Sequence, residues 1–237
     1  MSVPDPPASR RRRGFGRILG FAMSGCVLAA CGSTVPGHPV SVQRSAMTRH
    51  AAGDLSSLLP GPDRFPSGYT TVVPAGDGAA AAVTDLSAIT PGATIDPPDC
   101  APDPPDPERT AVTVGTDDRT RATITVVLTR TDEPLSRLGA ELSHCATVRV
   151  RHAAIDRTVT TELLPPPPVD ADDTLAFART TTGAPAGSAA DPTMRTLLAQ
   201  IGDVRIQTTA MSFGAAQPDT TGLDQVFTAT VADVRGR

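Results

Sequence analysis

The chain has 237 residues, of which 39% are apolar and 19% charged, and its formal net charge is −4. This composition is too apolar for a disordered chain and too polar for a protein that crosses a membrane several times, and the length suits one or two domains. The 24 prolines and 20 glycines together are fewer than in chains that are disordered throughout. These quantities limit the class of protein but leave its activity open.

The first 30 residues have the pattern of an export signal. An arginine-rich segment, residues 9–17, precedes an apolar stretch, residues 18–30, that is too short to span a bilayer. Small residues lie directly before Cys31, and this arrangement resembles the bacterial lipobox. The resemblance implies cleavage before Cys31, a diacylglyceryl group on its thiol and often a further acyl chain such as palmitate, which together anchor a protein stably. A cleavable signal with a chance cysteine at its end is the alternative.

Residues 31–40 are expected to form a tether and residues 41–237 a single extracytoplasmic domain, held at the cell membrane by its lipid. Loss of residues 1–30 removes five of the 21 arginines and one of the 25 acidic residues, so 16 and 24 remain and the formal charge becomes −8. A negative surface attracts neither nucleic acid nor anionic lipid. We therefore expect no nucleic-acid partner, and contact with the membrane through the N-terminal lipid.

Two cysteines, Cys100 and Cys145, remain once Cys26 leaves with the signal and Cys31 carries lipid. In an oxidising compartment a single pair of thiols favours a disulfide. Two free buried thiols, or a metal site that uses His144 next to Cys145, are the alternatives. No CxxC or HxxxH spacing accompanies the cysteines, so a metal site is the least favoured of the three.

The first half of the domain predicts two helices and a stiff loop. Apolar residues recur at helical spacing over residues 47–59, and a weaker helical pattern covers residues 79–89. Residues 96–108 combine prolines with five carboxylates. Such a loop could suggest Ca²⁺, but the prolines hold it extended and prevent it from wrapping a cation, so a solvated loop is predicted.

The second half predicts several strands and two helices. Residues 123–129 alternate as in a half-buried strand, and Asp132-Glu133-Pro134 then opens a helix with a capping acid. An apolar stripe along this helix places Cys145 on its buried side. Further strands are predicted at residues 148–151, 159–163, 175–181 and 204–208, and a last helix after Asp219-Thr220. The pattern indicates a single α+β domain whose central antiparallel β-sheet is covered by helices on one face.

Short motifs resemble a group of mycobacterial and nocardial exported lipoproteins of unknown function. The matching segments are Leu58-Leu59-Pro60, Phe65-Pro66-Ser67-Gly68-Tyr69, Pro97-Pro98-Asp99-Cys100, residues 138–145, residues 199–205 and residues 231–235. These lipoproteins are in turn similar to the extracellular sensor domain of a mycobacterial serine/threonine kinase. That resemblance implies an α+β fold with a central antiparallel sheet and a cleft for an unknown ligand, and it brings no catalytic residues.

No motif of the common hydrolases, zinc proteases or nucleotide-binding proteins occurs in the chain. The histidines at positions 38, 50, 144 and 152 are not clustered. We therefore predict no catalytic residue, no cofactor and no metal, and favour a binding or sensing module for a small hydrophobic ligand or an envelope protein. A structural or scaffolding lipoprotein and an envelope hydrolase with an unrecognised site are alternatives. A deep apolar cleft would favour the first of these three, and a His–acid–Ser cluster the last.

Overall fold

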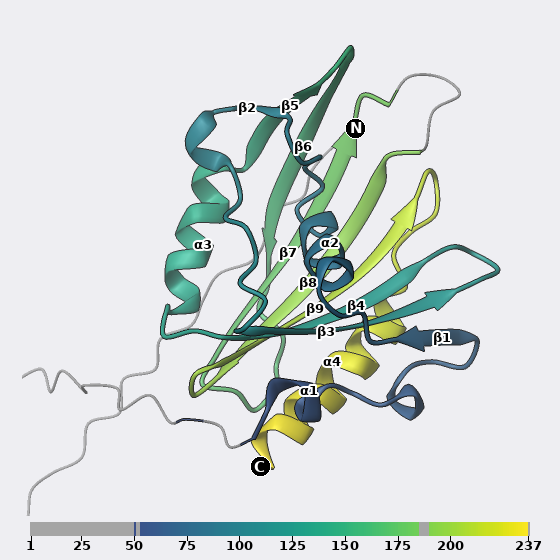
Figure 1. Ribbon diagram of the computed structural model, residues 1–237, viewed down its shortest axis with the longest axis vertical. Helices are drawn as coiled ribbons and strands as arrows, with labels where there is room; N and C mark the ends of the chain where they lie inside the picture. Colours follow the sequence, from purple (N-terminus) through teal and green to yellow (C-terminus); the bar gives the residue numbers. More distant parts are fainter. Residues whose placement is uncertain (1–49, 51–52, 185–189, 237) are drawn as a thin grey trace, which may run out of the picture. The chain divides into compact units, whose positions relative to one another are not determined.

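The computed structural model describes residue 50 and residues 53–184 and 190–236, which belong to one compact unit. Its strands are β1 (Tyr69–Val72), β2 (Thr94–Asp96), β3 (Thr110–Asp117), β4 (Thr123–Arg130), β5 (Thr147–His152), β6 (Ile155–Leu164), β7 (Asp173–Thr182), β8 (Pro192–Ile201) and β9 (Val204–Phe213). Its helices are α1 (Leu55–Leu58), α2 (Asp77–Asp85), α3 (Leu135–His144) and α4 (Thr220–Arg235), with 3₁₀ turns η1 (Pro62–Arg64) and η2 (Pro98–Cys100). The described residues thus confirm the predicted α+β class (Figure 1). The predicted signal, the tether and Cys31 lie outside them.

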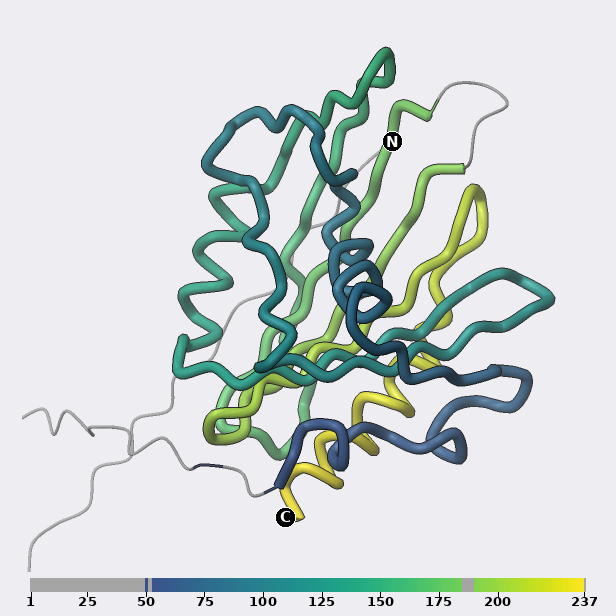
Figure 2. The backbone as a smooth tube through the Cα atoms, in the orientation of Figure 1, coloured from purple at the N-terminus to yellow at the C-terminus, as the bar shows by residue number. Residues whose placement is uncertain are grey.

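The nine described strands form one antiparallel sheet in the order β1-β3-β4-β9-β8-β7-β6-β5-β2. Strands β5 to β9 follow one another as a meander, and the β3–β4 hairpin joins this meander through β4 and β9. Helix α3 carries the chain from β4 to β5, past four intervening strands, as the backbone trace shows (Figure 2). No helix among the described residues is long and apolar enough to cross a membrane.

Helices cover both faces of the sheet, so the prediction of one covered face was wrong. On β4, Val126 packs with α4 and α1, whereas the next residue, Val127, packs with α2 on the other face. Thr125 is only 4% exposed, although it was expected on a solvated face. Strand β4 is therefore buried on both sides, because separate segments of the chain cover each of its faces.

Helix α4 confirms the helix predicted from the 3.6-residue period. The Asp219 carboxylate accepts a hydrogen bond from Gly222 N at 2.9 Å and so caps the first turn. The apolar stripe is buried against the sheet and consists of Leu223, Val226, Phe227, Val231 and Val234. Each such side chain stabilises the fold by about 1.5–3 kcal/mol when fully buried, so this helix contributes much of the core.

The aromatic turn at residues 65–69 packs closely on β3. Phe65 is 5% exposed and lies over Gly115, where a Cβ atom would come within 2.5 Å of the Phe65 ring. Tyr69 donates a hydrogen bond to the Asp219 carboxylate at 3.1 Å, and its pKa is raised by burial and by that carboxylate. The turn motif thus has a structural role, since it joins β1 to the start of α4.

Three local expectations were wrong in detail. A helix was predicted over residues 47–59, and residues 47–49 and 51–52 of this segment lie outside the described chain. In the described remainder of the segment, helix α1 has only four residues. Helix α3 has Pro134 at its N-cap position, and because a proline side chain has no hydrogen-bond acceptor, the predicted capping acid is absent. Strands β1, β2, β3 and β8 were not predicted. Leu197 and Leu198 are buried on opposite faces of β8, so this strand lacks an alternating pattern.

Candidate functional site

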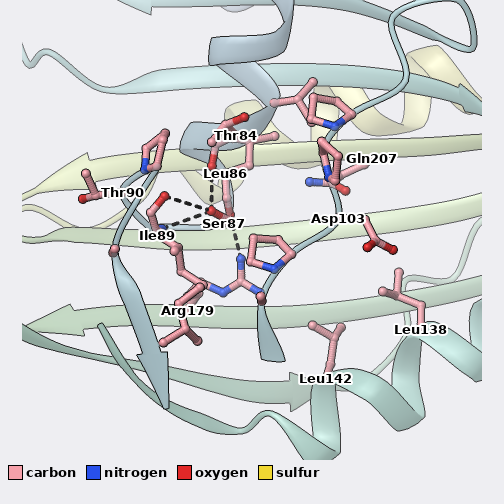
Figure 3. Close-up of a pocket in the computed structure, with 18 of the residues that line it drawn as sticks. Thr84, Leu86, Ser87, Ile89, Thr90, Asp103, Leu138, Leu142, Arg179 and Gln207 are labelled. Atoms are coloured by element: carbon pink, nitrogen blue, oxygen red, sulfur yellow. Dashed lines mark hydrogen bonds between the residues drawn. The ribbon is translucent and has the colours of Figure 1, made fainter. Parts of the chain in front are cut away.

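A cleft of about 440 Å³ lies on the α2–α3 face of the sheet. Its walls come from the end of α2 and the loop that follows, from the proline-rich loop at residues 101–105, and from α3, and its floor comes from β7 and β9 (Figure 3). The volume falls within the range of about 300–1,000 Å³ that is typical of small-molecule sites. Segments far apart in the sequence therefore form one concave site.

Apolar side chains line most of the cleft. Leu142 of α3 and Phe177 of β7 are buried, as is Leu86 just after α2, whereas Ile89 and Leu138 are half-buried. Several prolines of the two loops complete the walls. Such a lining favours an apolar ligand, because apolar surface that leaves water on binding contributes about 25 cal/mol per Å².

Arg179 is the charged group on the floor of the cleft. Its Nη1 donates to the backbone oxygen of Leu86 at 2.7 Å, and its Nε donates to the hydroxyl of Thr161 at 3.2 Å. The guanidinium carbon lies 5.1 Å from the centre of the Phe177 ring, within the range of cation–π contacts. Burial lowers the pKa of Arg179 to about 10, so this side chain still carries a positive charge at neutral pH.

Cys100 and Cys145 are joined by a disulfide that holds one wall of the cleft. Their Cα atoms are 5.7 Å apart, and the bond ties η2 to the residue that ends α3. The chain from Ala101 onward then forms the proline-rich wall. A cavity of about 80 Å³ beside the disulfide is lined by both cysteines and also by Arg179. The disulfide therefore fixes the loop at the point where it enters the cleft.

The histidines do not form a catalytic cluster with the described residues. His50 contacts the Asp203 carboxylate at 2.6 Å, and His144 contacts Asp99 at 2.8 Å. The hydrogen bond from His144 lowers the pKa of Asp99. No serine, threonine or cysteine side chain within residues 53–184 and 190–236 is hydrogen-bonded to either histidine. His38 lies outside the described chain.

One group of described side chains has the spacing of a metal site: Cys100, His144 and Cys145. Both sulfur atoms are used in the disulfide, however, and thiolates are the form that binds metal. In the oxidised protein this cluster therefore lacks the donors that a zinc site requires.

A second pocket, of about 430 Å³, lies near the β2 edge of the sheet and is lined by polar residues. Two of its three arginines are paired with carboxylates: Arg151 contacts Asp156 at 2.6 Å, and Arg157 lies 3.5 Å from Asp191, which is outside the lining. Because these pairs compensate the charges locally, the apolar cleft is the stronger candidate for a ligand site.

The sequence resemblance implied a cleft but not the residues that form it, and Arg179 was not predicted. The sequence did indicate that Arg179 lies on the same side of a predicted strand as Leu175 and Phe177, since alternate residues of a strand face the same way. Which segments cover that side could not be read from the strand itself. Cys100 and Cys145, by contrast, were both singled out.

No protein-family model matches the chain, and no curated protein matches it either. Among solved structures it is similar to an uncharacterized protein from Mycobacterium smegmatis, an Rv0999 ortholog, with 18% identity and a TM-score of 0.48 over 77% of this chain and 97% of the other. It is also similar to the extracellular domain of PknH from Mycobacterium tuberculosis, with 15% identity and a TM-score of 0.48 over 77% and 95% of the two chains. The structural neighbours are an uncharacterized mycobacterial protein and a mycobacterial extracellular domain, which matches the mycobacterial resemblance of the sequence motifs.

Proposed function

We propose that this protein is a lipid-anchored, non-catalytic binding module of the cell envelope, and that it takes a small apolar ligand in the cleft above β7 and β9. The cleft itself is the observation that carries the proposal, because its volume and its apolar walls suit a small molecule. The disulfide supports a location in an oxidising compartment outside the cytoplasm. The lipobox-like Cys31 supports attachment through lipid.

Obstructing the entrance of the cleft should weaken ligand binding without unfolding the domain. Ala101 is exposed, lines the cleft and has an extended backbone, so Ala101→Trp places an indole at the entrance with little strain. Titration with the uncharged dye Nile red should give one saturable site in the unsubstituted protein. We expect affinity at least tenfold weaker in Ala101→Trp.

The matched control is Ala215→Trp, which adds the same side chain to an exposed turn after β9, outside the lining of the cleft. This variant should bind Nile red as the unsubstituted protein does. Equal binding by all three proteins, or binding without saturation, would contradict the proposed cleft and favour a scaffolding role.

Membrane attachment is tested at Cys31. Metabolic labelling with an alkyne fatty acid should mark the protein and should leave Cys31→Ser unmarked, since the thiol is the expected site of lipid attachment. Fractionation should then place the unsubstituted protein with membranes and the variant in the soluble fraction. Equal labelling of the two proteins would refute the anchor while leaving the cleft untouched.

A further inference from the structure

Arg179 keeps part of its hydrogen-bonding capacity free. Its Nε and Nη1 donate to the neutral oxygens of Thr161 and Leu86, whereas Nη2 donates to no residue in the described part of the chain. Nη2 is also not among the enclosed polar atoms that lack a partner, so it is accessible to solvent, and Arg179 is one of the residues that line the cleft. A ligand in the cleft can therefore reach an N–H donor that carries part of a positive charge.

The charge of Arg179 lacks a carboxylate partner within the described residues. Of the five other half-buried arginines among the described residues, all but Arg195 have one within 4 Å. These four are Arg130, Arg157, Arg205 and Arg235, whose side chains are 14–26% exposed. Asp103 lines the same cleft but is exposed and forms no ion pair with Arg179. The fold thus neutralises these four arginines and leaves the cationic floor of the cleft uncompensated.

A partly buried charge of this kind favours an anion. Burial lowers the pKa of Arg179, which means that its surroundings oppose the charged form. A negative group that approaches Nη2 would offset this opposition and would form a charge-assisted hydrogen bond, which is stronger than a neutral one. Charge complementarity therefore selects the chemistry of the ligand's polar end.

We propose that the cleft binds a single-chain amphiphile with a carboxylate at one end, and that Arg179 holds this carboxylate; this proposal rests on the proposed function of the cleft. One guanidinium suits a single negative charge, and Arg179 is the only cationic side chain among the described residues that line the cleft. Asp103, the acidic residue of the lining, would repel a second negative charge. A dianionic phosphate is therefore disfavoured relative to a carboxylate.

The packing indicates where the alkyl chain would lie. Arg179 stacks on Phe177, and Phe177 belongs to the same apolar cluster as Leu142, with Leu138 packed against it. In Figure 3, Arg179 extends toward the loop after α2, whereas Leu138 and Leu142 point into the site from α3. A chain that starts at Nη2 would therefore pass over Phe177 and end between the two leucines.

The test compares decanoate with 1-decanol by titration calorimetry, using the full chain with Cys31→Ser so that it carries no acyl group of its own. The unsubstituted cleft should bind decanoate about 10- to 100-fold more tightly than the alcohol, the range expected for one hydrogen bond to a charged group. Arg179→Gln should remove this difference. The matched control is Arg195→Gln, because Arg195 is also half-buried and also lacks an ion pair with a described carboxylate. Arg195 differs in its position: it pairs with Ala178 across β8 and β7, and its side chain therefore lies on the face of the sheet opposite to Arg179.

Each outcome decides the proposal. Equal affinity for decanoate and decanol in the unsubstituted cleft would overturn the role of Arg179 and leave an apolar binding site. Binding of neither compound would overturn both this proposal and the proposed function. Tighter binding of decyl phosphate than of decanoate would overturn the choice of carboxylate. If Arg179→Gln does not fold, the comparison of acid and alcohol in the unsubstituted cleft still supports or refutes the charged head group.

Discussion

Replacing Cys100 and Cys145 together by alanine is expected to lower the free energy of unfolding by about 4 kcal/mol. The disulfide closes a loop with a sequence separation of 45 residues, and the entropy that it removes from the unfolded chain grows with loop length. For a domain of this size the melting temperature should fall by about 10 °C. Denaturant and thermal unfolding of the double variant beside the oxidised protein will measure both quantities.

The same variant should also weaken binding in the cleft. The residues directly after Cys100 form one wall, and without the disulfide the prolines keep this wall stiff but nothing covalent fixes its position. Reduced unsubstituted protein is the control, and it should melt like the double variant.

The burial of the disulfide gives a further expectation. Because Cys100 is only 8% exposed, the oxidised protein should resist mild thiols under native conditions. A double variant that melts like the oxidised protein would refute the structural role of the bond.

Phe227→Ala is expected to lower the free energy of unfolding by about 3–5 kcal/mol, since it removes a ring from the centre of the core and leaves a cavity. Phe227 is 1% exposed and packs between α4 and the sheet with residues of β4, β8 and β9. Its loss should reduce stability without changing the cleft, which lies on the other face of the sheet. Urea unfolding followed by circular dichroism measures the change.

Phe213→Ala is the matched control, because it removes the same ring from a position that is 42% exposed at the end of β9. We expect its effect to stay within about 0.5 kcal/mol, as for most surface substitutions. If the two variants unfold at the same denaturant concentration, the assignment of α4 as the main cover of this face is wrong.

Features that depend on neighbours along the chain could be predicted from the sequence. Helix α4 follows from the 3.6-residue period of its apolar residues together with a capping aspartate, and both signals lie within one segment. The alternation in β5 likewise reflects one buried and one exposed side, with Val148 and Val150 buried between exposed arginines. Counting the cysteines outside the predicted signal and lipobox singled out Cys100 and Cys145 without any knowledge of the fold.

Features that depend on segments far apart in the chain required the tertiary structure. Strand β8 is buried on both faces because α4 covers one and α3 the other, so its own sequence shows no alternation that would mark it as a strand. Arg179 follows the alternation of β7, yet its exposure to a cleft depends on the loop after α2 and on the proline-rich loop, which come from other parts of the chain. Local sequence determines how a segment is built and which side of it is apolar. Only packing decides what covers that side, because burial depends on contacts between residues that are distant in sequence.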